Sequence, residues 1–187
     1  MKQSFISEQK VFEEFKKAIV EALGVDENSI HSESSLIKDL GAESLDFLDI
    51  NYKLEQVFGI KMARHFILEH TEEMFGEGST VNDETQLTEN AIKLLKIRFA
   101  GDLPDLKAGV DLNEVPNLIT VQTMVSGVME LLNTLPEKCS SCGKAAWKLE
   151  DGNRIKCGFC EEYATFTNGD DLIKEWLSNV QKEHKIF

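Results

Sequence analysis

Apolar residues recur at helical spacing in three stretches of the chain and predict principal helices over residues 8–23, 44–58 and 118–132. The first of these ends at Gly24, a residue type that commonly terminates helices. A loop over residues 25–43 separates it from the second. The side chains that we expect to be buried in the first and last helices are Phe12, Phe15, Ile19, Leu23, Val121, Met124, Val125, Val128, Met129 and Leu132. The pattern therefore predicts a mostly α-helical fold.

The helix predicted over residues 44–58 is strongly amphipathic. Its apolar positions form two neighbouring stripes, Leu45, Leu48 and Tyr52 in one and Phe47, Leu54 and Phe58 in the other. Its outward-facing positions are Asp46, Asp49, Lys53 and Gln56. Ser44 opens the helix, so its hydroxyl lies beside unpaired backbone N–H groups at the positive end of the helix dipole. Two roles are open for this serine, a cap of the helix and the attachment point of a covalently bound phosphate.

Residues 61–110 separate the second principal helix from the last one and also have helical patterns. Apolar positions predict a helix over residues 62–75 and another over residues 89–99. Thr88 is the expected N-cap of the later helix, and Gly101 is its expected stop. We therefore interpret this segment as a helical insertion.

Two histidines lie in this insertion. His65 and His70 are five positions apart, and a continuous helix over residues 62–75 would point them to different faces. The sequence therefore predicts no metal site at these two residues.

Four cysteines form two Cys-x-x-Cys pairs that are separated by fourteen residues, Cys139/Cys142 and Cys157/Cys160. Each pair aims two sulfur atoms at one ion, which predicts a tetrahedral site of four thiolates. Four protein ligands leave no open position, so we expect a structural metal, zinc in preference to iron. A redox dithiol lacks the expected βαβ setting, and disulfides suit a reducing compartment poorly.

The segment around these cysteines resembles a zinc ribbon. Asp151-Gly152 predicts a hairpin turn between strands at residues 145–150 and 153–156. Residues 163–167 are expected to add a third strand. A core this small is expected to need its metal ion to fold.

A final helix is predicted from about Asp170, with an apolar stripe that we expect to pack on the ribbon or on the preceding helical domain. Pro136 marks the boundary between these parts. The sequence thus predicts a helical domain over residues 1–136 and a ribbon module with a C-terminal helix over residues 137–187.

The charge of the chain is strongly acidic and unevenly placed. Of the net charge of −13, residues 1–136 hold −12, because residues 137–187 hold 8 Lys/Arg against 9 Asp/Glu. Such a surface repels nucleic acid and anionic membranes and favours partners with basic patches. No apolar N-terminal run or membrane-spanning stretch is seen, so we expect a cytoplasmic protein without a membrane span. No catalytic motif is visible, and we expect no enzyme activity.

Residues 36–58 resemble the corresponding segment of the acyl carrier protein family, and the match contains no gap. In that family a Gly-x-Asp-Ser-Leu motif carries 4′-phosphopantetheine on its serine, and Gly41-Ala-Glu-Ser-Leu45 stands at the same place here. The usual aspartate before the serine is Glu43, which keeps the charge on a longer side chain. The resemblance implies that Ser44 carries the prosthetic group.

The resemblance also implies an acyl-carrier-like four-helix bundle. Residues 111–114 would supply its short third helix, and residues 119–122 resemble the start of its last helix. The insertion over residues 61–110 is not covered by the resemblance. Either its helices enlarge the core by packing on the carrier, which we favour, or they cover the cleft in which the family sequesters an acyl chain.

The resemblance implies a carrier that holds acyl groups as thioesters. The implied setting is fatty-acid, polyketide or related lipid biosynthesis. Its implied partners are a phosphopantetheinyl transferase and acyl-transferring synthases with basic docking patches. The acidic side chains expected to contact those patches are Glu43, Asp46, Asp49 and Glu55. A peptidyl or aminoacyl carrier is the near alternative. A zinc-ribbon protein-interaction module on a degenerate carrier scaffold is the alternative of another class.

Overall fold

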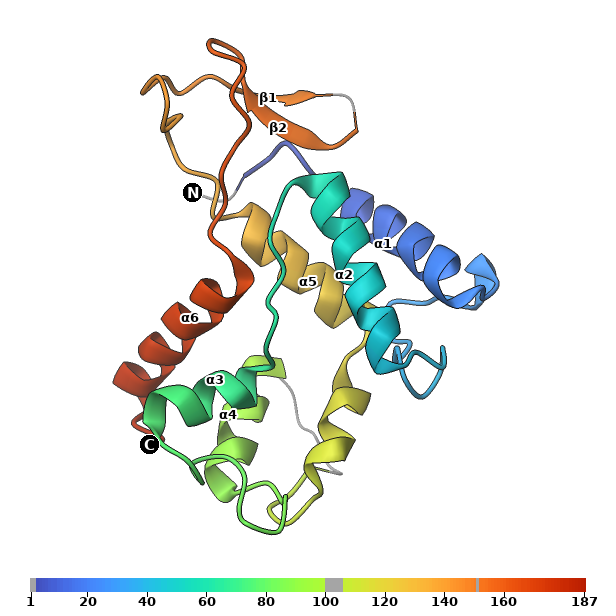
Figure 1. The fold of residues 1–187 in the computed structure, drawn as a ribbon, viewed down its shortest axis with the longest axis vertical. Helices are drawn as coiled ribbons and strands as arrows, with labels where there is room; N and C mark the ends of the chain where they lie inside the picture. The colour runs from blue at the N-terminus through green and yellow to red at the C-terminus, as the bar shows by residue number, and fades with distance from the viewer. Residues whose placement is uncertain (1–2, 100–105, 151) are drawn as a thin grey trace. The chain divides into compact units, whose positions relative to one another are not determined.

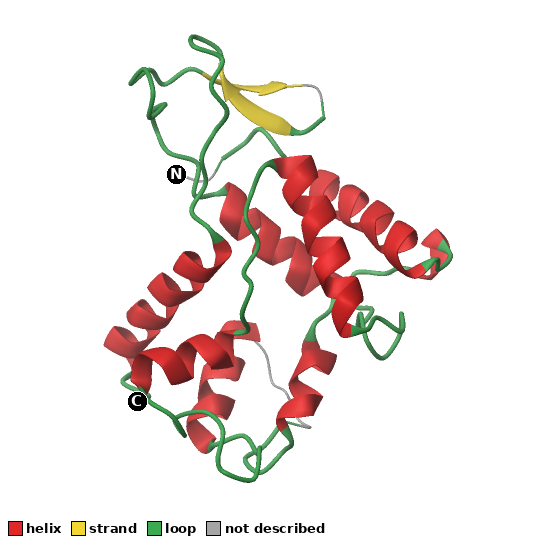
Figure 2. Ribbon diagram, in the orientation of Figure 1, coloured by secondary structure: helices red, strands yellow, loops and turns green. Residues whose placement is uncertain are grey.

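The computed structural model of the protein describes residues 3–99, 106–150 and 152–187. Two residues named above, Gly101 and Asp151, lie outside the described residues. The described chain is mostly helical, with one two-stranded sheet among the described residues, which confirms the predicted mostly helical class (Figure 2). It divides into two compact units, a first unit of residues 1–62 and 119–168 and a second unit of residues 63–118 and 169–187. None of the described helices has the length and apolar character that a membrane crossing requires.

The three principal helices predicted from the sequence all lie in the first unit. They are α1 (Glu8–Leu23), α2 (Ser44–Phe58) and α5 (Val121–Leu132), and α1 packs against both of the others (Figure 1). As predicted, α1 ends at Gly24, whose backbone N–H bonds the Val20 carbonyl. The largest fully buried side chains of these helices are Phe15, Ile19, Ile50, Leu54, Phe58 and Leu132.

The long loop before α2 is held by backbone hydrogen bonds to the start of α5. It contains the short helix η1 (Glu27–Ser29). Farther along, the Leu36 N–H donates to the Ile119 carbonyl at 3.0 Å, and the Ala42 N–H donates back to the Leu36 carbonyl at 2.8 Å. Leu36 and Ala42 are themselves buried. Hydrogen bonds at Leu36 and at Ala42 therefore hold the backbone that leads into α2.

The cysteine-containing segment forms a β-hairpin of β1 (Trp147–Glu150) and β2 (Arg154–Cys157), paired antiparallel. The third strand expected over residues 163–167 is reduced to an isolated bridge between Lys156 and Tyr163. Its backbone leaves the hairpin because the Thr167 N–H donates to the Thr134 hydroxyl at 2.9 Å instead of extending the ladder.

The second unit has a hydrophobic core of its own. It contains α3 (Ile67–Phe75), α4 (Glu89–Phe99), η2 (Leu112–Leu118) and α6 (Gly169–His184). Its buried core residues are Leu68, Leu87, Ala91, Leu94, Leu95, Leu106, Leu177 and Val180. The apolar stripe of α6 therefore packs within this unit, and its expected packing on the ribbon or on the carrier helices is wrong. The sequence-based domain boundary at residue 136 stays a prediction.

The insertion helix α3 begins five residues later than the predicted start at residue 62. The backbone N–H groups of Arg64 and His65 donate to the Asp170 carboxylate at 3.0 and 3.2 Å, so the chain bends there. His65 consequently precedes the helix, so helical spacing does not point it away from His70 as predicted. The two rings lie 5.6 Å apart in a T-shaped arrangement.

Candidate functional site

Ser44 lies exposed at the first residue of α2. The N-cap position belongs to Glu43, and the Asp46 carboxylate accepts a hydrogen bond from the Glu43 backbone N–H at 2.8 Å. The helix start is thus closed by acidic residues, and Ser44 does not occupy the capping position. Its hydroxyl stands at the positive end of a helix of 15 residues, where backbone N–H groups and the helix dipole favour an anionic group.

An apolar surface follows Ser44 along α2. Leu45, Leu48 and Tyr52 are 76%, 55% and 59% exposed. The sequence pattern placed these three side chains on one side of the helix, and the structure turns that side toward solvent, while Leu54 and Phe58 are buried. Exposed apolar side chains that gather on one helix face mark a surface for contact with another molecule.

The acidic side chains predicted for docking differ in exposure. Glu43 and Asp49 are exposed, and Asp46 is half-buried beside the start of the helix. Glu55 is 4% exposed, and its Oε1 accepts a hydrogen bond from the Met62 N–H at 2.9 Å. The prediction that Glu55 docks a partner is therefore wrong, because its carboxylate anchors the chain that leaves α2.

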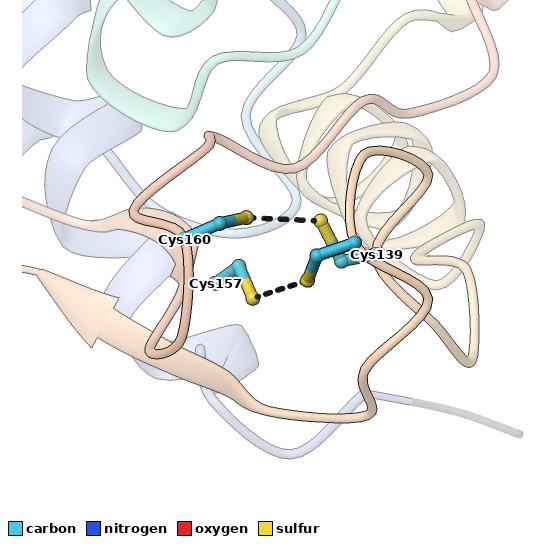
Figure 3. Close-up of side chains that lie close together, drawn as sticks. Cys139, Cys157 and Cys160 are labelled. Carbon is cyan, nitrogen blue, oxygen red and sulfur yellow. Dashed lines mark hydrogen bonds between the residues drawn. The ribbon is translucent and has the colours of Figure 1, made fainter.

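The four cysteines converge as their spacing predicts. Cys139 Sγ lies 3.6 Å from Cys160 Sγ, and Cys142 Sγ lies 3.6 Å from Cys157 Sγ (Figure 3). All four sulfur atoms lie within 4.8 Å of one another, and all four are free thiols. Zinc–sulfur bonds of about 2.3 Å in a tetrahedron place the sulfurs about 3.8 Å apart. The donor set therefore fits a tetrahedral metal ion.

Both Cys-x-x-Cys turns also stabilise negative charge on their first sulfur. The backbone N–H groups of Cys160 and Phe159 lower the pKa of the Cys157 thiol to about 7. The backbone N–H groups of Cys142 and Ser141 lower the pKa of the Cys139 thiol in the same way. Both turns thus point two amides at a sulfur, as expected where a thiolate must bind a cation.

The fourth thiol, Cys160, has a raised pKa. The backbone N–H of Glu162 lowers the pKa of Cys160, but burial and hydrogen bonds with the other three thiols outweigh it and raise the value to about 12. Four neighbouring sulfurs cannot all be anionic without a positive charge among them. A metal ion bound among them would supply that charge and would ionise all four.

The ribbon contacts the far end of α2 through Arg154. Its guanidinium donates to the Gln56 carbonyl at 3.4 Å and stacks over the Tyr163 ring at 4.8 Å. Gly59 ends α2 with φ +72°, and a Cβ at this position would lie 2.6 Å from Arg154 Nε. The left-handed backbone favours glycine here, and a Cβ would also force the Arg154 guanidinium to move.

We expect Gly59→Ala to destabilise the first unit more than Gly24→Ala does. Both glycines end helices with similar positive φ, but a Cβ at Gly24 meets nothing within 4 Å. Gly24→Ala should cost about 1 kcal/mol for the backbone alone, and Gly59→Ala about 0.5 kcal/mol more, because the Arg154 guanidinium must move and lose its hydrogen bond to the Gln56 carbonyl. Urea denaturation measures both values. Adding Arg154→Ala to Gly59→Ala should remove the excess, whereas equal effects of the two glycine variants would contradict the contact.

Comparison with known proteins identifies the family. Residues 13–72, which include Ser44, match the family model described as the phosphopantetheine attachment site, the class of helical carrier domains. An acyl carrier protein of Thermotoga maritima is 45% identical over 56 residues, which cover 30% of this chain and 69% of that protein. One of Clostridium acetobutylicum is 42% identical over 72 residues, which cover 38% and 88%. No solved structure matches the chain. The chain belongs to the acyl carrier protein family.

Proposed function

We propose that this protein is a non-enzymatic acyl carrier that holds acyl groups as thioesters on a 4′-phosphopantetheine arm attached to Ser44. The observation that carries the proposal is the exposed Ser44 hydroxyl at the first residue of α2, inside the segment that matches the attachment-site family. On this proposal α1, α2 and α5 are three helices of the family's bundle, and η2 corresponds to the short third helix.

Loading of Ser44 is a transfer of phosphopantetheine from coenzyme A by a phosphopantetheinyl transferase. The Ser44 oxygen forms a bond to the phosphorus next to pantetheine, the pyrophosphate bond breaks, and adenosine 3′,5′-bisphosphate leaves, while the hydroxyl proton is released. The new phosphodiester carries one negative charge. The helix N-terminus stabilises that charge, which supports Ser44 as the attachment point.

Docking of partner enzymes is assigned to the exposed face of α2 beside Ser44. This face combines the carboxylates of Glu43 and Asp49 with the apolar side chains of Leu45 and Leu48. Asp46 contributes its charge while it also closes the helix start. A synthase or transferase with a basic patch around an apolar depression fits such a surface, and the charges act mainly on encounter rate and specificity.

The four cysteines are proposed to hold a structural zinc ion, with iron as the second choice, since both metals accept four thiolates. The metal holds the ribbon, and Arg154 connects the ribbon to the end of α2 opposite Ser44. The two relatives described above align with 30% and 38% of this chain, so more than half of the chain lies outside the part that they match. We infer a specialised carrier for lipid biosynthesis that serves a restricted set of enzymes in the cytoplasm.

The proposal is tested by incubating the full-length protein with coenzyme A and several phosphopantetheinyl transferases. Several enzymes are needed because Glu43 replaces the aspartate that such enzymes usually meet. We expect the intact mass to rise by one phosphopantetheine group, located on the peptide containing Ser44. If no transferase produced an adduct, the acyl-carrier function would be rejected. The alternative, a zinc-ribbon protein-interaction module on a degenerate carrier scaffold, would then be favoured. The thioester on protein isolated from its native cell then separates an acyl carrier from a peptidyl carrier.

A further inference from the structure

Two histidines and one aspartate gather in the second unit, apart from Ser44 and the cysteines. His65 precedes α3, His70 is on α3, and Asp170 is in the first turn of α6. One ligand atom from each lies within 4.8 Å of the other two. His70 is 3% exposed, whereas the His65 side chain is 62% exposed. The cluster is thus anchored in the protein on one side and open to solvent on the other.

The distances in this cluster suit a common metal ion. His70 Nε2 lies 2.8 Å from Asp170 Oδ1, and His65 Nδ1 lies 3.8 Å from the same oxygen. Metal–ligand bonds of about 2.0–2.2 Å in tetrahedral geometry place neighbouring ligand atoms about 3.4 Å apart. The two observed separations lie on either side of that value, so small side-chain rotations bring the donors to it.

Glu73 gives His70 the environment of a metal-binding imidazole. Its carboxylate lies 3.6 Å from His70 Nδ1 and is held by Lys174 at 2.9 Å. Without a metal ion, His70 Nε2–H donates a hydrogen bond to Asp170 Oδ1 at 2.8 Å. A proton moved to Nδ1, on the side of Glu73, would free the Nε2 lone pair, and a bound cation would then replace the proton between these two atoms. A carboxylate beside the second ring nitrogen is the usual arrangement around a metal-bound histidine.

Asp170 is held in one orientation by its neighbours. The backbone N–H groups of Arg64 and His65 and the His70 ring all donate hydrogen bonds to its carboxylate. The two backbone groups also fix the orientation of the carboxylate at 3.0 and 3.2 Å. A carboxylate with a fixed orientation presents its oxygen atoms to a cation without rearrangement.

We propose that His65, His70 and Asp170 bind a second metal ion, a divalent transition metal for which Zn²⁺ is the expected occupant. Two imidazoles and one carboxylate are a donor set that such ions accept. Three protein ligands leave a coordination position for water, in contrast to the four-thiolate site. The ion would connect the start of α6 to α3, two elements of one hydrophobic core.

The experiment counts zinc in the full-length protein. Metal-free protein is reloaded with Zn²⁺, freed of unbound metal and analysed by mass spectrometry for zinc per chain. We expect His65→Ala to bind one equivalent fewer than wild type, because an exposed side chain is removed without disturbing the core. His184→Ala is the matched control, since it removes an exposed histidine of α6 that is outside the cluster. Equal zinc contents of wild type and His65→Ala would overturn the proposal.

Cobalt substitution identifies which ion is lost. The thiolate-to-cobalt absorption of the four-cysteine site should be unchanged in His65→Ala, and its loss would overturn the assignment of the missing ion to the histidine cluster. Glu73→Gln should keep the full zinc content at saturation but weaken the affinity of this site about 10–100-fold. An unchanged affinity would show that Glu73 does not position His70 for a metal.

Discussion

Replacing Ser44 with alanine is expected to abolish phosphopantetheine loading completely. The reaction requires a hydroxyl oxygen at this position, and alanine offers no atom that can form the phosphodiester. Because Ser44 is exposed and Glu43 occupies the N-cap, the free energy of unfolding should change by no more than about 0.5 kcal/mol. Intact-mass analysis after incubation with coenzyme A and a transferase should show the adduct on wild type and none on the variant.

Ser126→Ala is the matched control for this experiment. Ser126 is also an exposed serine on a helix of the first unit, but it lies within α5 and not at a helix start. This control should load as fully as wild type. An adduct that persists on Ser44→Ala would place the attachment elsewhere and contradict the proposed site. Equal loading with a lowered stability would instead point to a structural role of the serine hydroxyl.

Features that depend on residues close together in the chain could be predicted from the sequence. The bounds of α1, α2 and α5 follow from local apolar periodicity and from helix ends such as Gly24. The cysteine cluster follows in the same way, because each Cys-x-x-Cys turn fixes its own geometry and only the approach of the two turns is tertiary. Local physical chemistry therefore sufficed to find the candidate metal ligands and the helix that starts at Ser44.

Features that depend on distant residues could not be predicted. Glu55 is charged, which favours a surface position, but its side chain is buried and its carboxylate accepts a hydrogen bond from the Met62 backbone N–H. His70 acquires its carboxylate partner from Asp170, one hundred positions later in the chain. The predicted start of α3 at residue 62 was wrong for the same reason. The distant Asp170 carboxylate accepts hydrogen bonds from the backbone N–H groups of Arg64 and His65, and the chain bends there. The spacing of His70 and Glu73, one helical turn apart, is the only local signal that pointed to this cluster.

Loss of the ribbon metal is expected to unfold the ribbon while leaving α2 intact. The ribbon buries few apolar side chains, Ile155 and Ala164 among them. A structural zinc ion contributes about 10–16 kcal/mol in small domains of this kind, which exceeds what so small a core provides. Cys157→Ser should therefore lose one zinc per chain and the amide-exchange protection of residues 154–157, measured by hydrogen exchange with mass spectrometry.

Ser140→Ala is the matched control, because it changes the first cysteine turn without removing a ligand. This variant should keep its zinc and its amide protection. The ribbon contacts α2 near Gly59, whereas Ser44 lies about 22 Å away along a helix of 15 residues. Loading of Ser44 in Cys157→Ser should thus fall by less than about twofold, since such a distance leaves the helix start in place. Full amide protection of residues 154–157 in metal-free protein would contradict the structural role of the ion.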